Sequence, residues 1–277
     1  MALARFTASS YRTAMRIVSL CPSLTELVFD LGLGDSLVGV TKFCVHPADG
    51  VHRIEKVGGT KTPKIERIAE LRPDLVLLNE EENRVEDAEA LGAAGIACHI
   101  SFPKTAIGTA AMVRSIGESV GRAEHAERIA RAIEEAARQA REGSEGLPAV
   151  RYAYLIWREP LMSVSGDTFI SDLLGLAGGE NAFADRPKRY PVVEARDLAA
   201  AGLHAVLLST EPFPFQEGHI AEVSRQTGLA PEIFHIVDGE MLSWHGSRTP
   251  GGIDYAAEVI GRIRDETHYA DAPQPGR

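Results

Sequence analysis

Two stretches of the chain, residues 68–81 and 198–211, follow one pattern. Each contains the end of an expected helix, a turn and a short apolar strand, and each stops at a carboxylate, Glu81 or Glu211. The shift in numbering from 68 to 198 is the same as that from 81 to 211, and we call it the repeat offset. An unbroken apolar run is typical of a strand that is buried on both faces of a sheet. The repeat therefore favours two α/β lobes of similar build, with a ligand cleft between them. The alternative is one large sheet that uses the same unit many times.

Helical and strand patterns alternate along the chain, which favours mainly parallel sheets flanked by helices. Short apolar runs predict strands at 16–20, 37–40, 75–78, 96–100, 152–157, 205–208 and 233–237. Further helices are expected near 168–177 and 253–266. Ser23-x-x-Glu26 has the spacing of a capping box, and Thr62-Pro63 has the order of a helix cap followed by the first helical residue.

One long amphipathic helix is predicted between the lobes. Apolar residues recur at i, i+3 and i+4 from Ala123 to about Ala140, and a Gly-rich cluster with Pro148 follows. We therefore expect an N-terminal α/β lobe at 15–121, a connecting backbone helix at 122–146 and a C-terminal α/β lobe at 147–268. The remaining residues, 1–14 and 269–277, are expected to be tails.

Composition excludes several classes of protein. The formal net charge of −10 argues against a nucleic-acid surface, and no apolar run approaches the roughly 20 residues of a membrane span. The three cysteines do not suggest a disulfide framework. Residues 1–14 lack the apolar run of about 7–15 residues of a secretory signal. We therefore expect a cytoplasmic protein as the sequence is written, with Met15 as an alternative start.

Ligands of open parallel α/β sheets bind beyond the carboxyl ends of the strands. The residues near those ends are therefore the ligand-binding candidates: Lys42, Thr60, Lys61, Asn79, Glu81, Glu82, Trp157, Tyr190, Glu211, Phe213, Phe215, Trp244 and Arg248. Aromatic rings beside a few polar groups suit a sizeable organic ligand. As alternatives, both tryptophans belong to the core, and Phe213 and Phe215 anchor a buried loop.

Three residues are candidate metal ligands: Cys44, His46 and His245. Thiolate and imidazole are good ligands for zinc, copper or cobalt, and residues two apart on an extended segment face one side. The alternative is a packing cysteine beside ordinary loop histidines. No nucleophile elbow, zinc-protease motif or phosphate loop is present, so we expect no catalytic residues.

Three segments resemble the helical-backbone substrate-binding proteins of ABC importers, which bind cobalamin, ferric siderophores, haem and some metals. They are 16–26, which contains Pro-Ser-Leu-Thr-Glu, then 65–76, which ends in Pro-Asp-Leu-Val, and 172–181. The resemblance is strongest to the cobalamin-binding branch. It implies two lobes joined by one long helix and, for most members, a periplasmic location.

The resemblance also implies an acidic residue on each lobe that docks on arginines of the importer permease. Glu66 matches the first of these positions, but the repeat offset leads from it to Arg196, with Glu194 and Asp197 beside it. Like charges across an interface cost several kcal/mol, so docking is expected to be weakened. Together with the missing export signal, this reversal suggests a cytoplasmic relative that holds or senses its ligand.

The resulting hypothesis is a non-enzymatic protein that binds a metal chelate between its lobes, with a corrinoid favoured. No cofactor is required, and the expected bound ligand is a corrinoid or an iron chelate. The first alternative is a binding protein for ferric siderophore or haem. The second is a cytoplasmic enzyme that handles a metal or cofactor, or a ligand-gated regulator, on the same fold.

Overall fold

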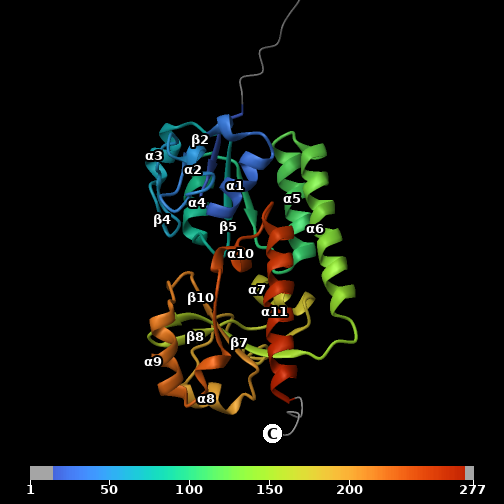
Figure 1. The fold of residues 1–277 in the computed structure, drawn as a ribbon. Helices are drawn as coiled ribbons and strands as arrows, with labels where there is room; N and C mark the ends of the chain where they lie inside the picture. The colour runs from blue at the N-terminus through green and yellow to red at the C-terminus, as the bar shows by residue number, and fades with distance from the viewer. Residues whose placement is uncertain (1–14, 272–277) are drawn as a thin grey trace, which may run out of the picture. The chain divides into compact units, whose positions relative to one another are not determined.

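The structure, a computed structural model, describes residues 15–271, with side chains through residue 267. The chain divides into two compact units between Ser101 and Phe102, and each unit has its own sheet (Figure 1). The α/β fold class with two lobes is therefore confirmed, and the single large sheet is wrong. None of the helices within the described part of the chain is long and apolar enough to cross a membrane.

The first unit has a four-stranded parallel sheet in the order β2-β1-β5-β6. These strands are β1 (Ile17–Ser19), β2 (Leu37–Val40), β5 (Leu75–Asn79) and β6 (Cys98–Ser101). A small antiparallel hairpin joins β3 (Gly58–Gly59) to β4 (Thr62–Pro63). The helices of the first unit are α1 (Pro22–Asp30), α2 (Ala48–Val51), α3 (Ile65–Glu70) and α4 (Val85–Ala93), with a 3₁₀ turn at Gly34–Ser36.

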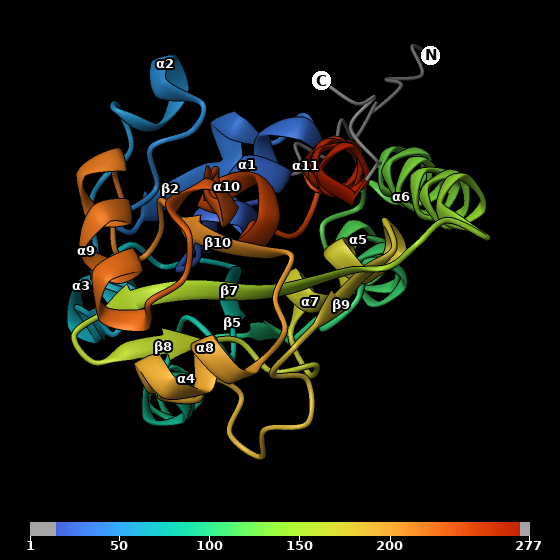
Figure 2. The same cartoon turned by 60° about the horizontal axis from the view of Figure 1, so that its bottom comes forward.

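The second unit has a five-stranded sheet in which β7 (Val150–Arg158) lies between β10 (Ala205–Ser209) and β8 (Leu161–Ser163) (Figure 2). β11 (Phe234–Val237) pairs with β10, and β9 (Gly179–Asn181) pairs with β7. Only β8 runs antiparallel. The helices are α5 (Ala106–Ser119), α6 (Ala123–Ser144), α7 (Phe169–Leu176), α8 (Ala195–Ala200), α9 (Glu217–Thr227), α10 (Gly239–Ser243) and α11 (Thr249–Asp271), with a 3₁₀ turn at Pro231–Ile233.

The sequence repeat is also a structural repeat. The repeat offset carries both ends of α3 onto the ends of α8, and both ends of β5 onto the ends of β10. The same offset relates three pairs of buried core residues: Ile68 and Leu198, Val76 and Val206, Leu78 and Leu208. In each unit the helix and the strand therefore pack through side chains at the same positions.

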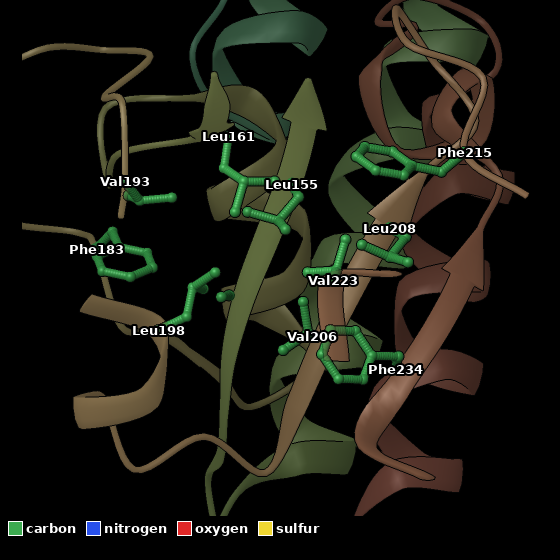
Figure 3. Close-up of a cluster of buried hydrophobic side chains, with 11 residues drawn as sticks. Leu155, Leu161, Phe183, Val193, Leu198, Val206, Leu208, Phe215, Val223 and Phe234 are labelled. Atoms are coloured by element: carbon green, nitrogen blue, oxygen red, sulfur yellow. The ribbon is translucent and has the colours of Figure 1, made fainter. Parts of the chain in front are cut away.

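One face of the second sheet packs against α8 and α9. Figure 3 shows this cluster, in which Phe215 lies next to Leu208 and Phe234 lies next to Val206. The burial of these eleven side chains is the main stabilising contribution of this layer, at roughly 1.5–3 kcal/mol for each large apolar side chain.

The long helix α6 confirms the amphipathic pattern that begins at Ala123, and its apolar stripe packs on α5 and α11. Arg114 on α5 joins the pair by ion pairs to Glu127 at 2.6 Å and Glu134 at 2.5 Å. The division of the chain places α5 in the second unit, whereas we expected the N-terminal lobe to extend to residue 121. The expected boundaries at 122, 146 and 268 stay predictions.

Helix α11 is fastened by the buried Arg264. Its guanidinium donates Nε to the carbonyl of Pro148 at 2.8 Å and Nη2 to that of Ala177 at 3.0 Å. Ala177 is the C-cap of α7, where unpaired carbonyls favour a cation. The last described helix thus stabilises the end of α7 and the segment that enters β7.

Two local predictions are wrong. Helix α1 begins at Pro22 with Cys21 as its cap, so Ser23 and Glu26 lie inside the helix and form no capping box. Thr62 and Pro63 form β4 instead of starting a helix, and α3 begins two residues later with Lys64 as cap. At Thr62-Pro63 the pairing of β4 with β3 overrides the local signal.

Candidate functional site

Three of the expected ligand-binding residues of the second unit come together at its strand ends. The indole Nε1 of Trp244 donates to Glu211 at 3.0 Å. The Arg248 guanidinium carbon lies 4.7 Å from the centre of a Trp244 ring, and Nη1 pairs with Glu240 at 2.8 Å. Trp244 is largely buried, so its indole mainly connects the end of α10 to the loop after β10.

A hollow of about 510 Å³ opens beside this cluster, at the carboxyl ends of β10 and β11. Its lining residues are Thr210, Glu211, Ile236, Val237, Asp238 and Glu240. Three of the six are carboxylates, and no lysine or arginine is among them. The hollow therefore offers acceptors for hydrogen-bond donors.

Local hydrogen bonds fix the position of Glu211. The amide of Glu211 donates to Ser209 Oγ at 3.2 Å, and the buried Tyr154 hydroxyl donates to the same oxygen at 2.9 Å. On the neighbouring strand, Asp238 caps α10 by accepting from the Met241 amide at 3.2 Å. Both carboxylates are thus placed by structure within their own unit.

Trp157 and Phe213 form an aromatic platform at the end of β7. Their ring centres are 5.8 Å apart with an edge-to-face angle of 72°, and Trp157 is 40% exposed. Phe213 is held from behind by Phe215 and His219, and Arg158 lies 5.9 Å from its ring. This arrangement agrees with a ligand-contacting role for Trp157.

The ligand-contact prediction for Phe215 needs correction. Its ring is 2% exposed and packs in the core cluster of Figure 3. The alternating prolines do not project both rings the same way, because Phe215 points inward while Phe213 covers it. Phe215 therefore anchors the loop, as the alternative interpretation proposed.

Tyr190 lies on the loop between β9 and α8, next to a small group of cations. Arg189 stacks 4.7 Å from the Phe102 ring centre and lies 6.0 Å from that of Tyr190. Asp167 pairs with both Arg189 and Lys104. Tyr190 is half-buried, and its role as a wall of the site stays a prediction.

In the first unit, Asn79 builds the loop after β5. Its Oδ1 accepts from the amides of Glu81 at 2.9 Å and Glu82 at 3.3 Å, and the side chain is almost fully buried. Asn83 donates to the carbonyls of Leu20 and Thr60, so Thr60 is also held inside this loop structure. The prediction of Asn79 as a ligand contact is therefore corrected to a loop-forming role.

Two lysines, Lys42 and Lys61, are exposed on this face, beside the acidic run of residues 80–82. Lys61 donates to the Glu81 carbonyl at 2.6 Å, and Lys42 lies 4.9 Å from the Phe43 ring centre. Burial raises the pKa of Glu82, with a further increase from Glu81 and an opposing effect of Lys61. Sequence reasoning missed Phe43, which is 50% exposed, although an aromatic residue directly after Lys42 was a usable signal.

Two of the three predicted metal ligands pack inside their own units. Cys44 is buried, and its Sγ makes hydrogen bonds within the first unit with Thr25 at 3.1 Å and Thr41 at 3.2 Å. His245 is buried against Phe169 in the second unit, and His46 is half-buried. Within residues 15–271 no group of three or more His, Cys, Asp or Glu side chains is arranged to hold a metal ion. The packing alternative holds for Cys44 and His245.

Glu66 and Arg196 occupy equivalent places in the repeat. Each is the second residue of its helix, α3 or α8, and both side chains are exposed. Arg196 pairs with Glu194 at 2.8 Å, whereas Asp197 pairs with Arg186 at 3.2 Å and caps α8. The charge reversal is thus real at structurally equivalent positions.

Comparison with known proteins places the chain in a family. A family profile described as periplasmic binding protein matches residues 17–213. The chain is 30% identical over 185 residues to a vitamin B12-binding protein of Vibrio campbellii, covering 67% of each chain. It is 28% identical over 208 residues to that of Photorhabdus laumondii, covering 75% of each.

Solved structures agree in fold. The periplasmic vitamin B12-binding protein of Vibrio cholerae has a TM-score of 0.78 at 22% identity, covering 91% of this chain and 98% of that one. A periplasmic haem-binding protein of Roseiflexus sp. RS-1 has the same TM-score, identity and coverage. The resemblance noted in the sequence is confirmed, and the chain belongs to the periplasmic binding protein family.

Proposed function

We propose that this protein binds a corrinoid non-enzymatically, with the Trp157–Phe213 platform as the principal contact of the second unit. The observation that carries the proposal is an edge-to-face aromatic pair at the end of a sheet strand, in which Trp157 is exposed and Phe213 is half-buried. Two relatives whose names specify vitamin B12 support the choice of ligand.

The chemistry of the platform suits a macrocycle. Aromatic rings offer a large apolar contact area and lose little conformational entropy on binding. Polar groups at the rim of an apolar contact then fix the orientation of the ligand. In the second unit these groups are Thr210, Glu211 and Asp238, which line the hollow at the ends of β10 and β11.

The proposal extends to a transporter partner. An importer that accepts the ligand from this protein would contact α3 through Glu66 and would meet Arg196 at the equivalent place on α8. Glu194 is the exposed acidic residue beside Arg196, but the two are paired with each other. We therefore expect docking that depends more on the first unit than on the second.

The location of the protein stays a prediction. The family description names the periplasm, which supports the alternative location rather than the cytoplasm. The cytoplasmic prediction rests on residues 1–14, which lie outside the described residues. Fractionation of cells that express the native gene, followed by immunoblotting, separates the two locations.

The first experiment is a titration of the purified protein with aquocobalamin, followed by calorimetry and by the visible spectrum. The variant is Trp157→Ala, and the matched control is Leu147→Ala. Leu147 precedes the opposite end of the same strand β7 and is 49% exposed. We expect one-to-one binding, a loss of about tenfold or more in the variant and no change in the control.

Haemin and a ferric siderophore are titrated in parallel. Saturable binding of either one without binding of aquocobalamin would contradict the corrinoid proposal and favour the first alternative. An unchanged affinity in Trp157→Ala would place the corrinoid elsewhere on the protein. Turnover of any bound ligand would contradict the non-enzymatic part of the proposal.

A further inference from the structure

Carboxylates predominate in the lining of the hollow in the second unit, and one of them, Glu240, is paired with Arg248 at 2.8 Å. The lining includes the carboxylates of Glu211, Asp238 and Glu240, and the six lining residues include no lysine, arginine or histidine. The one polar lining residue without charge is Thr210, whose Oγ1 accepts from the Gly239 amide at 2.9 Å. Hydrogen-bond acceptors therefore dominate this surface.

Such a surface distinguishes ligands with amide side chains from ligands with carboxylate side chains. A carboxylate that accepts from a neutral amide N–H forms a charge-assisted hydrogen bond, which is stronger than a neutral one. A ligand carboxylate in the same place would meet like charge, which costs several kcal/mol when it is desolvated. Corrinoids with amide side chains carry such N–H donors, whereas haem and unamidated corrinoids carry carboxylates.

The carboxylates of the hollow are not grouped as metal ligands. No group of three or more His, Cys, Asp or Glu side chains in the described part of the chain is arranged for a metal. Different local contacts position the two residues at the ends of β10 and β11. The backbone of Glu211 is held by its hydrogen bond to Ser209, and Asp238 is held as the cap of α10. Each of the two residues is therefore positioned beside the hollow by contacts of its own.

We propose that Glu211 and Asp238 make this site selective for tetrapyrroles with amide side chains over those with carboxylate side chains. The inference rests on the proposed function, because it assigns a ligand class to the same site. It adds that the two residues determine specificity mainly by repelling anionic ligands.

The test uses two corrinoids that share a macrocycle and lack the nucleotide loop: dicyanocobinamide, with amide side chains, and dicyanocobyrinic acid, with carboxylates. At neutral pH we expect the wild-type protein to bind dicyanocobinamide at least about tenfold more tightly than dicyanocobyrinic acid. Added salt should narrow this ratio because it screens charge repulsion.

The variants are Glu211→Gln and Asp238→Asn, alone and together. Glutamine retains an oxygen for Trp244 Nε1, and asparagine is a good helix cap, so both preserve the local structure. The control is Glu232→Gln, an exposed residue before the other end of β11 that removes the same charge. We expect the double variant to bind the carboxylate ligand severalfold more tightly, and the control to match wild type.

An unchanged ratio in the double variant, with melting temperatures near wild type, would overturn the specificity proposal alone. A wild-type protein that binds both corrinoids equally would have the same consequence. A wild-type protein that binds no corrinoid, aquocobalamin included, would overturn the proposed function as well. Calorimetry therefore separates the two failures.

Discussion

In both units a polar side chain at the strand end accepts a hydrogen bond from the backbone amide two residues later, but the surrounding side chains differ. After β5 the side chain of Asn79 accepts from the amide of Glu81, and after β10 the side chain of Ser209 accepts from the amide of Glu211. Around this shared turn the first unit exposes Lys42 and Lys61 beside the acidic run of residues 80–82, whereas the second combines aromatic rings with carboxylates. The repeat therefore fixes where a loop starts, and the residues after it fix the chemistry.

The largest expected effect tests how far the loops diverge beyond the shared turn. Phe215 is 2% exposed, whereas Val85, at the equivalent position of the first repeat, is 68% exposed. Phe215→Ala should lower the free energy of unfolding by about 3–5 kcal/mol through the cavity that it leaves. Val85→Ala should change it by less than about 0.5 kcal/mol, and chemical denaturation of both variants measures the difference. Similar losses would show that the loops are equivalent.

The shared turn itself is tested by Ser209→Ala, which leaves the buried Tyr154 hydroxyl without its acceptor. We expect a loss of about 1–3 kcal/mol in unfolding free energy, and a similar loss for Asn79→Ala in the first unit. In a double-mutant cycle, Tyr154→Phe should recover part of the Ser209→Ala loss, because it removes the stranded donor. Additive losses in the cycle would contradict the hydrogen bond to Tyr154.

A smaller effect, on how protein stability depends on pH, is specific to the first unit. Burial raises the pKa of Glu82 above its ordinary value of 4.5, whereas the equivalent position of the second repeat is Pro212. The native protein thus binds the proton more tightly than the unfolded chain, so ionisation of Glu82 reduces stability as pH rises through the raised pKa. Glu82→Gln should therefore be more stable than wild type at about pH 7 and equal to it below about pH 4.

The control for Glu82 is the exposed Glu80, two residues earlier in the same acidic run. Glu80→Gln should leave the pH profile of thermal unfolding near that of wild type. An equal gain at neutral pH in both variants would assign the effect to net charge instead of burial.

The smallest stability effect is expected at the exposed positions of α3 and α8. Glu66→Ala and Arg196→Ala should each change the unfolding free energy by less than about 0.5 kcal/mol, since exposed ion pairs contribute little. A difference between them should appear only in pull-down with a candidate permease, where loss of Glu66 is expected to weaken binding more. A large change in melting temperature for either variant would contradict the surface role.

Sequence reasoning located the elements that are set by apolar periodicity. The strand at 37–40 was predicted with its observed bounds, and the strand predicted at 205–208 is β10, which ends one residue later. These features depend on which residues avoid water, and that is visible in the local pattern.

The errors concern residues whose surroundings come from distant parts of the chain. Thr62-Pro63 has the sequence of a helix start but pairs with Gly58–Gly59. Cys44 was a candidate metal ligand, but its Sγ is hydrogen-bonded to Thr25 and Thr41. The antiparallel β8 was missed because it is three residues long and has no alternation to detect. Local pattern cannot show which loop residue faces inward, and this limit explains the error at Phe215.

The position of α11 also bears on the order in which the protein is made. The first unit uses one continuous stretch that ends at Ser101, so its sheet is complete before the second unit has been synthesised. The second unit instead needs α11, which packs on α6 and α7 and carries the Arg264 contacts to Pro148 and Ala177. Because domains generally fold as units during synthesis, the first unit is free to fold at the ribosome. The second unit must wait until nearly all of its residues have emerged.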